Sequence, residues 1–568
     1  MRRLRRRLPG AVICALAVSL MACTSSVTMP PKPSESPQAT PPAVSSSPID
    51  TPTELPSASP TPSATERSTT PQPNHEPTIE PPTTPAAIDN SDPGQCGAVP
   101  LHAAREFRAM WLSSVITLDF PSAGGLSKDA IMAEYRGWLD LAQEFHHNAI
   151  VVQIRPTADA FWPSDYAPWS QWLTGRTDGT GPGWDPLAEI IAETHARGIE
   201  FHAWFNPFRA SMSTSLGGIG GDIDKLPAGH ALREHPEWAV VYPRRDRTRS
   251  QISFDPGVPA ARRYVEDSIL EVVRMYDIDA VHFDDYFYPY AVNGEEFNDA
   301  ASFASYGSGS RADWRRSNVN ALVQEMNTRI KEIDPSLKFG ISPFGIWKNA
   351  TSAGGAGTNG TESYDAIYAD TRTWVRNGWV DYIAPQIYWN IGFKVADYTA
   401  LAPWWVRQAD GTDVQVYIGQ ADYKVGSGGA WNSPGELSSQ IALARSAGVD
   451  GFIHFRAEFL RDDPLGAQTR YRTERYATPA LSPTMPQLPA TPPSAPSAVT
   501  LSADGNRVRL EWKPSSGAAR YAIYRVSGDR ANLVAHVGGT SFTGAAGTYC
   551  VSALDRAWNE GDASAPVS

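Results

Sequence analysis

Cysteine is scarce in this chain, with four Cys among 568 residues. Cys14 lies in an N-terminal apolar stretch, Cys23 closely follows that stretch, and Cys96 and Cys550 are far apart in the sequence. A scaffold held by many disulfides is therefore excluded, because such scaffolds are small and rich in Cys. Two alternatives remain open for Cys96 and Cys550: a single bridge between them, or two unpaired buried thiols.

Positive charge is also in short supply. The formal net charge is −12, and the first 22 residues hold five arginines and no acids, so the chain without them would carry about −17. Such a chain has no general affinity for a phosphate backbone, and nucleic acid is not expected as a partner. A hydrophobic content of 41% nevertheless indicates a globular core, and the length favours two to four domains.

Long apolar runs are missing as well. Ala11 to Met21 is too short to span a bilayer comfortably and follows a basic head, which predicts a signal peptide over residues 1–22. Its ending, Leu20-Met21-Ala22-Cys23, resembles the bacterial lipobox and implies lipidation of Cys23. The expected location is extracytoplasmic, anchored to the bacterial membrane through this lipid. The alternative is an ordinary signal peptide in which Cys23 is incidental.

Proline collects in two segments, and these divide the chain. Residues 23–97 are dominated by Pro, Ser and Thr and predict a disordered stalk, because they cannot bury enough surface to fold. Residues 479–496 form a second Pro-rich stretch, interpreted as a linker. The segment between them, 98–478, is expected to fold alone, and residues 497–568 form a further module.

Residues 98–478 alternate short β-forming runs with helical patterns. Apolar residues recur at helical spacing in two of the intervening stretches, and Asp185-Pro186 supplies a helix cap followed by an N1 proline. Eight strands alternating with helices predict an α/β fold, a (β/α)8 TIM-like barrel. An open doubly wound sheet is disfavoured, because no Gly-rich phosphate loop follows any strand. The expected strands are 107–115, 149–154, 199–205, 278–283, 338–342, 382–387, 414–418 and 451–455.

The C-terminal module has alternating apolar residues between turn signals, which indicates a small β-sandwich. Its strand ending in Trp512 and the pattern from Tyr549 to Asn559 resemble a fibronectin type III domain. No catalytic chemistry is expected of it, and its interpreted role is spacing or docking.

The stretch Tyr276 to Pro289 is the most informative part of the barrel. An apolar run, Ile278 to Phe283, ends in Asp284 and Asp285, and aromatic residues follow at once. Polar groups at the C-terminal end of a barrel strand face the active-site mouth, so the two acids predict catalysis. The alternative is that one Asp caps a turn and the other is a surface charge.

Other strand ends also carry polar and aromatic groups, which together suit a sugar ligand. No nucleophile elbow is present, so an esterase is disfavoured. His202, His282 and His454 lack close ligand spacing, so no metal and no cofactor are expected. The long segment 206–257 predicts one wall of the binding cleft. Substrate contacts are assigned to Arg155, Trp204, Asn206, Arg209, His282, Tyr286, Gln386, Tyr388 and Trp389.

Several long motifs resemble the bacterial glycosyl-hydrolase-like family ten. They are W-L-S-S-V-I-T-L-D-F-P (111–121), F-W-P-S (161–164), H-A-W-F-N-P-F-R (202–209), F-D-D-Y-F-Y-P (283–289), Y-A-D-T-R-x-W-V (368–375), D-Y-I-A-P-Q-I-Y-W (381–389), Y-K-V-G (423–426) and the region 455–458. The chain is similar to lipoprotein hydrolases that cut peptidoglycan glycan strands stripped of peptides. The resemblance implies a barrel, a cell-envelope glycan substrate and hydrolysis.

Glycosidases usually use two separated carboxyl groups, whereas adjacent residues on one strand point to opposite sides. One of Asp284 and Asp285 is expected to act and the other to orient it, with Glu458 as the candidate second carboxyl. A weaker likeness to family-eighteen chitinases implies help from the substrate's N-acetyl group, although Tyr286 occupies the position of their acid Glu. A catalytically silent glycan-binding protein and a polysaccharide esterase or deacetylase stay as alternatives.

Overall fold

The computed structural model describes residues 94–212, 219–244, 250–292 and 294–568. The predicted signal peptide, the lipidation site Cys23 and almost all of the stalk lie outside the described residues. Within the described ranges, no helix has both the length and the apolar character needed to cross a membrane.

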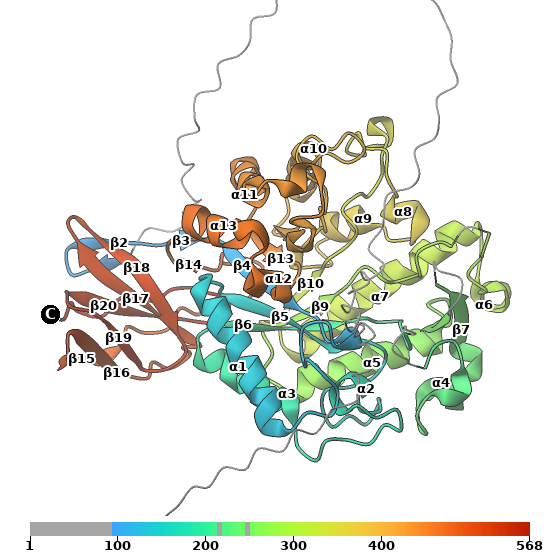
Figure 1. Ribbon diagram of the computed structural model, residues 1–568, viewed down its shortest axis with the longest axis horizontal. Helices are drawn as coiled ribbons and strands as arrows, with labels where there is room; N and C mark the ends of the chain where they lie inside the picture. Colours follow the sequence, from blue (N-terminus) through green and yellow to red (C-terminus); the bar gives the residue numbers. More distant parts are fainter. Residues whose placement is uncertain (1–93, 213–218, 245–249, 293) are drawn as a thin grey trace, which may run out of the picture. The chain divides into compact units, whose positions relative to one another are not determined.

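Eight parallel strands close into a barrel in the order β4-β5-β6-β9-β10-β11-β12-β13 (Figure 1). The fold class expected from the sequence is confirmed, and each expected strand has its counterpart. The barrel strands are β4 (Phe107–Leu112), β5 (Ala149–Arg155), β6 (Glu200–Phe205), β9 (Ala280–Phe283), β10 (Lys338–Ile341), β11 (Tyr382–Ile383), β12 (Gln415–Gln420) and β13 (Gly451–His454).

Some of these strands end earlier than the sequence predicted. At these points the chain turns away and leaves the regular pairing with its neighbours. β4 ends at Leu112 because Ser113 and the residues after it turn into a 3-10 helix, η1 (Val115–Thr117). β11 is only two residues long, and beyond it Gln386 alone keeps one bridge to each neighbour, at Phe344 and at Gly419. These early ends leave turns at the C-terminal side of the barrel, where side chains can converge.

Helices follow the strands and cover the outside of the barrel (Figure 1). In α1 (Lys128–Glu144) the buried residues recur every three or four positions, and in α3 (Pro186–Ala196) the Asp185 side chain accepts a hydrogen bond from the Ala188 N–H, as the cap pattern predicts. The other helices are α2 (Gln171–Thr174), α4 (Ala231–Glu234), α5 (Pro259–Met275), α6 (Ala300–Tyr306), α7 (Arg311–Ile333), α8 (Ser363–Ala366), α9 (Thr371–Arg376), α10 (Tyr398–Ala409), α11 (Glu436–Ala447), α12 (Ala457–Asp462) and α13 (Ala467–Arg475).

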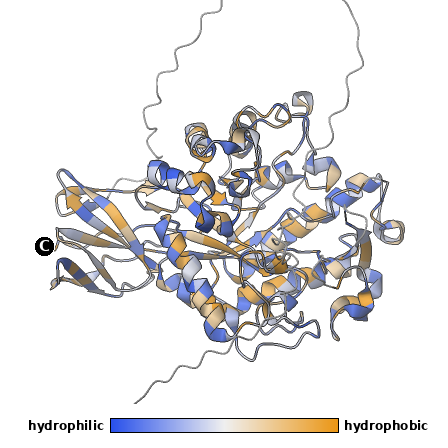
Figure 2. Ribbon diagram, viewed as in Figure 1, coloured by the Kyte–Doolittle hydropathy of each residue, from blue (hydrophilic) through white to orange (hydrophobic). Residues whose placement is uncertain are grey.

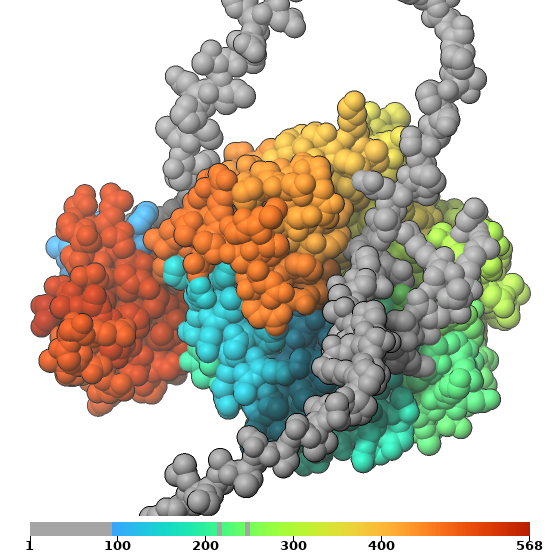
Figure 3. Space-filling model, in the orientation of Figure 1, coloured from blue at the N-terminus to red at the C-terminus, as the bar shows by residue number. Residues whose placement is uncertain are grey.

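Alternate residues of each strand belong to two separate apolar cores. In β9, Ala280 packs in the cluster inside the barrel, whereas Val281 and Phe283 pack in the larger cluster between strands and helices. Successive side chains of a strand point to opposite faces, so His282 and then Asp284 lie on the interior side. Figure 3 shows the surface of the last barrel segment (orange) beside that of the first (cyan), as closure of the barrel requires.

The C-terminal module consists of two antiparallel sheets, which fit the expected β-sandwich. Trp512, Ile523 and Val551 belong to the core between them. Hydrophilic and hydrophobic segments alternate along its strands (Figure 2). The strands are β15 (Ser497–Asp504), β16 (Arg507–Lys513), β17 (Arg520–Ser527), β18 (Arg530–Val537), β19 (Ser541–Ala545) and β20 (Tyr549–Leu554).

The first described residues join this module instead of the barrel. β1 (Gln95–Cys96) pairs with β2 (Val99–His102), and β2 pairs in parallel with β18. Cys96 forms a disulfide with Cys550 across 454 residues of sequence. Of the two alternatives left open by the sequence, the structure therefore contains the bridge.

The Pro-rich stretch 479–496 is not a detached linker, and here the structure differs from the sequence interpretation. β14 (Ala480–Leu481) pairs with β3 (Ala104–Arg105), while Met485 and Leu488 are buried in the cluster that fills the barrel interior. Proline restricts the backbone of this segment but does not prevent its few large apolar side chains from packing. The segment therefore contributes core surface to the barrel.

Buried polar contacts join the module to the barrel. Glu200 accepts hydrogen bonds from Lys338 of β10 and from the Trp558 indole of the module, and Asp279 accepts one from Arg520 of the module at 3.1 Å. These groups lie at the N-terminal ends of the strands, because Glu200 begins β6 and Asp279 precedes β9. The module therefore covers the barrel end opposite to Asp284.

Candidate functional site

Asp284 is held at the C-terminal end of β9 by its neighbours on β6. Its backbone N–H donates to the Phe205 carbonyl, and its carboxylate accepts from Asn206 Nδ2 at 2.9 Å and from the Asp285 N–H at 2.8 Å. Asn206 is fully buried, and Asp284 is 7% exposed. The structure thus brings together two residues that the sequence assigned to the site.

Asn206 is itself fixed by a chain of hydrogen bonds across three strand ends. Its Oδ1 accepts from Gln153 Nε2 at 2.6 Å and from Arg209 at 2.8 Å. Gln153 Oε1 in turn accepts the backbone N–H groups of Ser114 and Val115. These contacts fix the Asn206 amide so that its NH2 group points at Asp284, which locks the carboxylate in one position.

Asp285 has a different environment. It is 3% exposed and accepts a hydrogen bond from the Tyr290 hydroxyl. Burial raises the pKa of the Asp285 carboxyl well above its usual range, and the negative charge and hydrogen bond of the Asp284 side chain raise it further. A carboxylic acid in this position holds its proton and can donate it.

Aromatic rings surround the two acids. The Arg209 guanidinium lies 5.3 Å from the centre of the Tyr286 ring, and Tyr290 packs edge-on to Phe344, which in turn meets Trp389. Tyr388 is buried, and burial together with nearby acidic groups raises its pKa well above its usual range. Aromatic faces beside carboxylates and amides suit the apolar faces and hydroxyls of sugars.

Three of the predicted substrate contacts lie deeper than the mouth. Arg155 is 1% exposed and donates to the carbonyls of Asn206 and Pro207. The ring nitrogens of His282 are hydrogen-bonded to the Tyr382 and Ser342 hydroxyls and to the Trp111 indole N–H. Trp204 packs in the barrel interior. The Gln386 amide donates to the Ser342 carbonyl. Arg155 and His282 therefore support the site instead of lining it.

Glu458 lies on α12, directly after β13. Its carboxylate is bound by Arg456 and lies 4.0 Å from Arg461. Arg456 also pairs with Asp119, a buried acid in the turn after β4 whose second oxygen accepts the Ser113 N–H. No contact between Glu458 and Asp284 or Asp285 occurs in the part of the chain that the structure describes.

Asp119, Gln153 and Tyr290 are site residues that were not assigned from the sequence. Gln153 and Tyr290 carried a signal, because Gln153 ends the second expected strand on its interior side and Tyr290 follows the paired acids. Asp119 is part of the motif at 111–121 but does not lie at a strand end, since it is seven residues beyond β4 and reaches the site only through the turn at η1.

Each of the three barrel histidines has a hydrogen-bonding partner. His202 contacts Glu200 and Tyr382, and His454 contacts Asp422 and Tyr476. Burial lowers the pKa of both His202 and His282. Among the described residues, no group of three or more His, Cys, Asp or Glu side chains is placed to hold a metal ion.

The family model described as "Glycosyl hydrolase-like 10" matches residues 106–434. The chain belongs to this family. The match runs from the start of β4 to the loop after β12, so it includes Asn206, Arg209, Asp284, Asp285 and Tyr290. Glu458 and the C-terminal module lie outside it.

Curated relatives of the family align with most of the chain. Glycosyl hydrolase YngK of Bacillus subtilis is 44% identical over 485 residues, covering 81% of this chain and 92% of that protein. Glycosyl hydrolase DigH of Escherichia coli is 35% identical over 402 residues, covering 67% of this chain and 90% of that protein. The protein is therefore a glycoside hydrolase or a related enzyme, and its substrate is a glycan.

Among solved structures, the glycoside hydrolase domain of PgaB from Bordetella bronchiseptica matches with a TM-score of 0.44 and 12% identity, covering 65% of this chain and 98% of that one. An α-L-fucosidase from Paenibacillus thiaminolyticus matches with a TM-score of 0.38 and 15% identity, covering 66% and 50%.

Proposed function

We propose that this protein hydrolyses glycosidic bonds of a cell-envelope glycan, with peptide-free peptidoglycan strands as the substrate. The observation that carries the proposal is the pair Asp284 and Asp285 at the mouth of the barrel, one held by Asn206 and the other buried, with its pKa raised by burial and by Asp284. Membership of the glycosyl hydrolase-like family supports the reaction class. The resemblance to hydrolases of stripped glycan strands supports the polymer.

In this mechanism, Asp285 is the general acid. Its carboxyl transfers a proton to the glycosidic oxygen as the bond to the anomeric carbon breaks. The Asp284 carboxylate is held between the Asn206 amide and a backbone N–H, and it favours the positive charge that develops on the sugar ring. Water then adds to the anomeric carbon, and the proton that it loses restores the acid form of Asp285.

The two acids do not form the usual pair that flanks a glycosidic bond. Their side chains are hydrogen-bonded to each other, whereas retaining and inverting enzymes separate the two carboxyl groups by about 5 Å or more. Another group is therefore needed on the face of the sugar ring from which the anomeric carbon is attacked. In one version of the proposal this group is an N-acetyl group of the substrate. In the other version it is the carboxylate of Glu458.

Product analysis tests the function. Purified protein is incubated with peptide-free glycan strands, and chain length, reducing ends and released acetate are measured. The proposal requires shortened chains with new reducing ends. Release of acetate from chains of unchanged length would support an esterase or deacetylase instead, and binding without any product would support a silent glycan-binding protein.

Replacing Tyr290 by phenylalanine is expected to move the alkaline limb of the pH–rate profile to higher pH. The Tyr290 hydroxyl donates to the ionised form of Asp285, so its loss raises the pKa of that carboxyl further. An acid must be protonated to act, and activity then persists to higher pH. An alkaline limb that stays in place or moves to lower pH would contradict Asp285 as the acid.

We further propose that lipid on Cys23 anchors the protein outside the cytoplasm. The sequence ending Leu-x-Ala-Cys and the Pro-rich segment after it support this location. Cys23→Ser is expected to release the protein into the soluble fraction, because one acylated residue is the predicted anchor. Fractionation of cells that express each form measures this, and unchanged membrane association of the variant would count against the anchor.

A further inference from the structure

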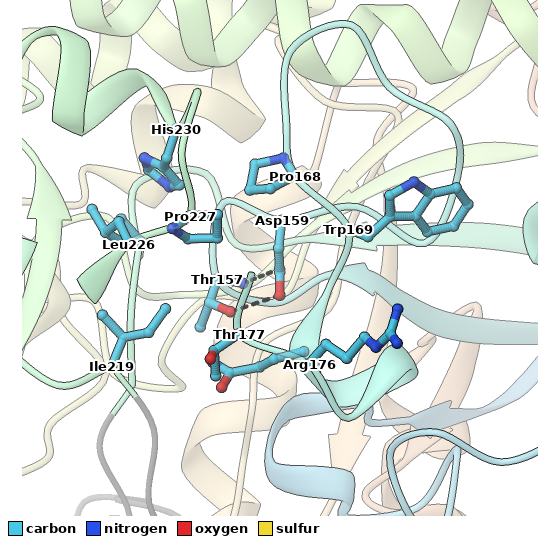
Figure 4. Close-up of a pocket in the computed structure, with 12 residues that line it drawn as sticks. Thr157, Asp159, Pro168, Trp169, Arg176, Thr177, Ile219, Leu226, Pro227 and His230 are labelled. Atoms are coloured by element: carbon cyan, nitrogen blue, oxygen red, sulfur yellow. Dashed lines mark hydrogen bonds between the residues drawn. The ribbon is translucent and has the colours of Figure 1, made fainter. Parts of the chain in front are cut away.

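A narrow pocket lies between the loop after β5 and the loop after β6 (Figure 4). Thr157, Asp159 and Trp169 come from the first loop, and Ala210, Leu226 and His230 from the second. The cavity volume is about 20 Å³, counted as space for the centre of a water molecule. One or two waters or one small substituent fit this space, but a whole sugar ring does not.

The pocket is linked to the catalytic acids through a short chain of hydrogen bonds. Arg209 bonds to Asn206, which holds Asp284, and the same Arg209 donates through Nε to the Pro156 carbonyl at 2.9 Å. Thr157 and Ala210, which follow Pro156 and Arg209 in sequence, line the pocket. A chain bound across the barrel mouth can therefore place a substituent of a nearby sugar in it.

His230 supplies a buried hydrogen-bond donor that no described residue satisfies. Its Nδ1 accepts the backbone N–H of Leu232 at 3.1 Å, which places the proton of the neutral ring on Nε2. Nε2 is buried and has no hydrogen-bond partner among the described residues, and burial lowers the pKa of the ring to about 4. A buried N–H group of this kind is stabilised when an acceptor oxygen enters the pocket.

Asp159 supplies the complementary acceptor. It is 6% exposed, and its oxygens accept from the Thr157 N–H at 2.9 Å and the Thr157 hydroxyl at 3.0 Å. The Ser170 side chain also bonds to it. Four acceptor positions on a carboxylate leave room for one more donor. Apolar side chains complete the walls: Ile219, Leu226, Pro168 and Pro227.

We propose that this pocket binds the acetamido group of an N-acetylated sugar next to the cleaved bond. The carbonyl oxygen accepts from His230 Nε2, the amide N–H donates to Asp159, and the methyl group packs on Leu226 and Pro227. A hydroxyl in place of the acetamido group reaches neither the donor nor the apolar wall. The inference rests on the proposed function, since it names the residues that recognise the N-acetyl group of the same substrate.

The test measures binding, so that it does not depend on turnover. The full chain carrying Asp285→Asn is titrated with a β-1,4-linked N-acetylglucosamine oligomer and with the matching glucose oligomer, both neutral. In that background, His230→Phe is expected to weaken binding of the N-acetylated oligomer by about tenfold and to leave the glucose oligomer unchanged, as for the loss of a buried hydrogen bond.

The His230 ring packs on Phe254, so its replacement can disturb folding. Thr177→Trp is therefore a second variant, which tests the pocket without changing a packed residue. Thr177 is exposed and lines the pocket, so a bulky ring there blocks the entrance without entering the core. The same tenfold loss is expected. Thr180→Trp is the matched control, because Thr180 is an exposed threonine three residues away that does not line the pocket.

A folded Thr177→Trp variant that binds the N-acetylated oligomer as tightly as its parent would overturn the inference and leave the pocket as a water site. Equal losses for both oligomers, or no binding by the parent, would overturn it as well. Failure of the proposed function gives a different result. In that case the selective loss of binding remains, but the protein with Asp285 intact produces no new reducing ends from any glycan.

Discussion

Asp285→Asn is expected to lower turnover on peptide-free glycan strands by about a hundredfold or more, the usual scale of general acid catalysis. Asparagine keeps the size of the side chain and the hydrogen bond from Tyr290, but it has no acidic proton for the leaving oxygen. A rate assay with folded protein measures the effect. Activity near that of the unsubstituted protein would remove Asp285 from the mechanism.

Asp284→Asn is expected to cause a loss of similar size for a different reason. Asn206 already presents its NH2 group to this position, so an amide at 284 replaces a charge-assisted hydrogen bond with a weaker one and removes the negative charge beside the anomeric carbon.

Glu458→Gln separates the two versions of the proposal. It lowers turnover if Glu458 is the second carboxyl and leaves turnover nearly unchanged if the substrate's N-acetyl group attacks.

Thermal unfolding at several pH values is the control for folding. The pKa of Asp285 is higher in the folded protein than in the unfolded chain, so its contribution to stability is fully present below the unfolded pKa, about 4, and is lost as pH rises through the folded pKa. Asparagine does not ionise. The variant should therefore be at least as stable as the unsubstituted protein at neutral pH, and its stability should depend less on pH.

The strands and the acids could be predicted because short patterns determine them. Eight β-forming runs separated by helical periods leave few alternatives to a barrel, and the alternation along β9 places Asp284 inside. Depth along a strand was harder to predict. His282 lies two residues before Asp284 on the same face of the strand. This distance of about 7 Å is enough to place His282 in the packed interior and Asp284 at the mouth.

Contacts between distant segments could not be predicted from local patterns. Tyr290 reaches Asp285 because the turn after β9 folds back, and Asp119 reaches Arg456 because the barrel closes between β13 and β4. The disulfide between Cys96 and Cys550 likewise depends on β2 joining the module. Spacing in the sequence contains none of this information, whereas closure of the barrel produces it directly.

A chain limited to residues 98–478 is expected to misfold or aggregate, contrary to the expectation that this segment folds alone. Such a chain lacks Met485 and Leu488, which are 1% and 3% exposed in the barrel interior. Truncating one buried side chain of this kind to alanine costs about 2–5 kcal/mol, and whole domains are stable by only about 5–15 kcal/mol. The loss of both side chains therefore removes much of the stability.

Loss of the module adds an electrostatic cost. Asp279 is buried between His195 and Arg520, and Glu200 is bound by Lys338 and Trp558. Without Arg520 and Trp558, the two carboxylates lose partners at an end of the barrel that is no longer covered. Removing one partner of a buried ion pair is strongly destabilising, because the remaining charge is left uncompensated.

A chain of residues 94–568 is the matched control and is expected to unfold in a single cooperative transition. The double variant Met485→Ala/Leu488→Ala in that chain isolates the role of the Pro-rich segment, and a large fall in its midpoint temperature is expected. Calorimetry and circular dichroism measure both. If residues 98–478 alone were soluble and unfolded cooperatively at a similar temperature, the module and the segment before it would contribute no essential part of the barrel core.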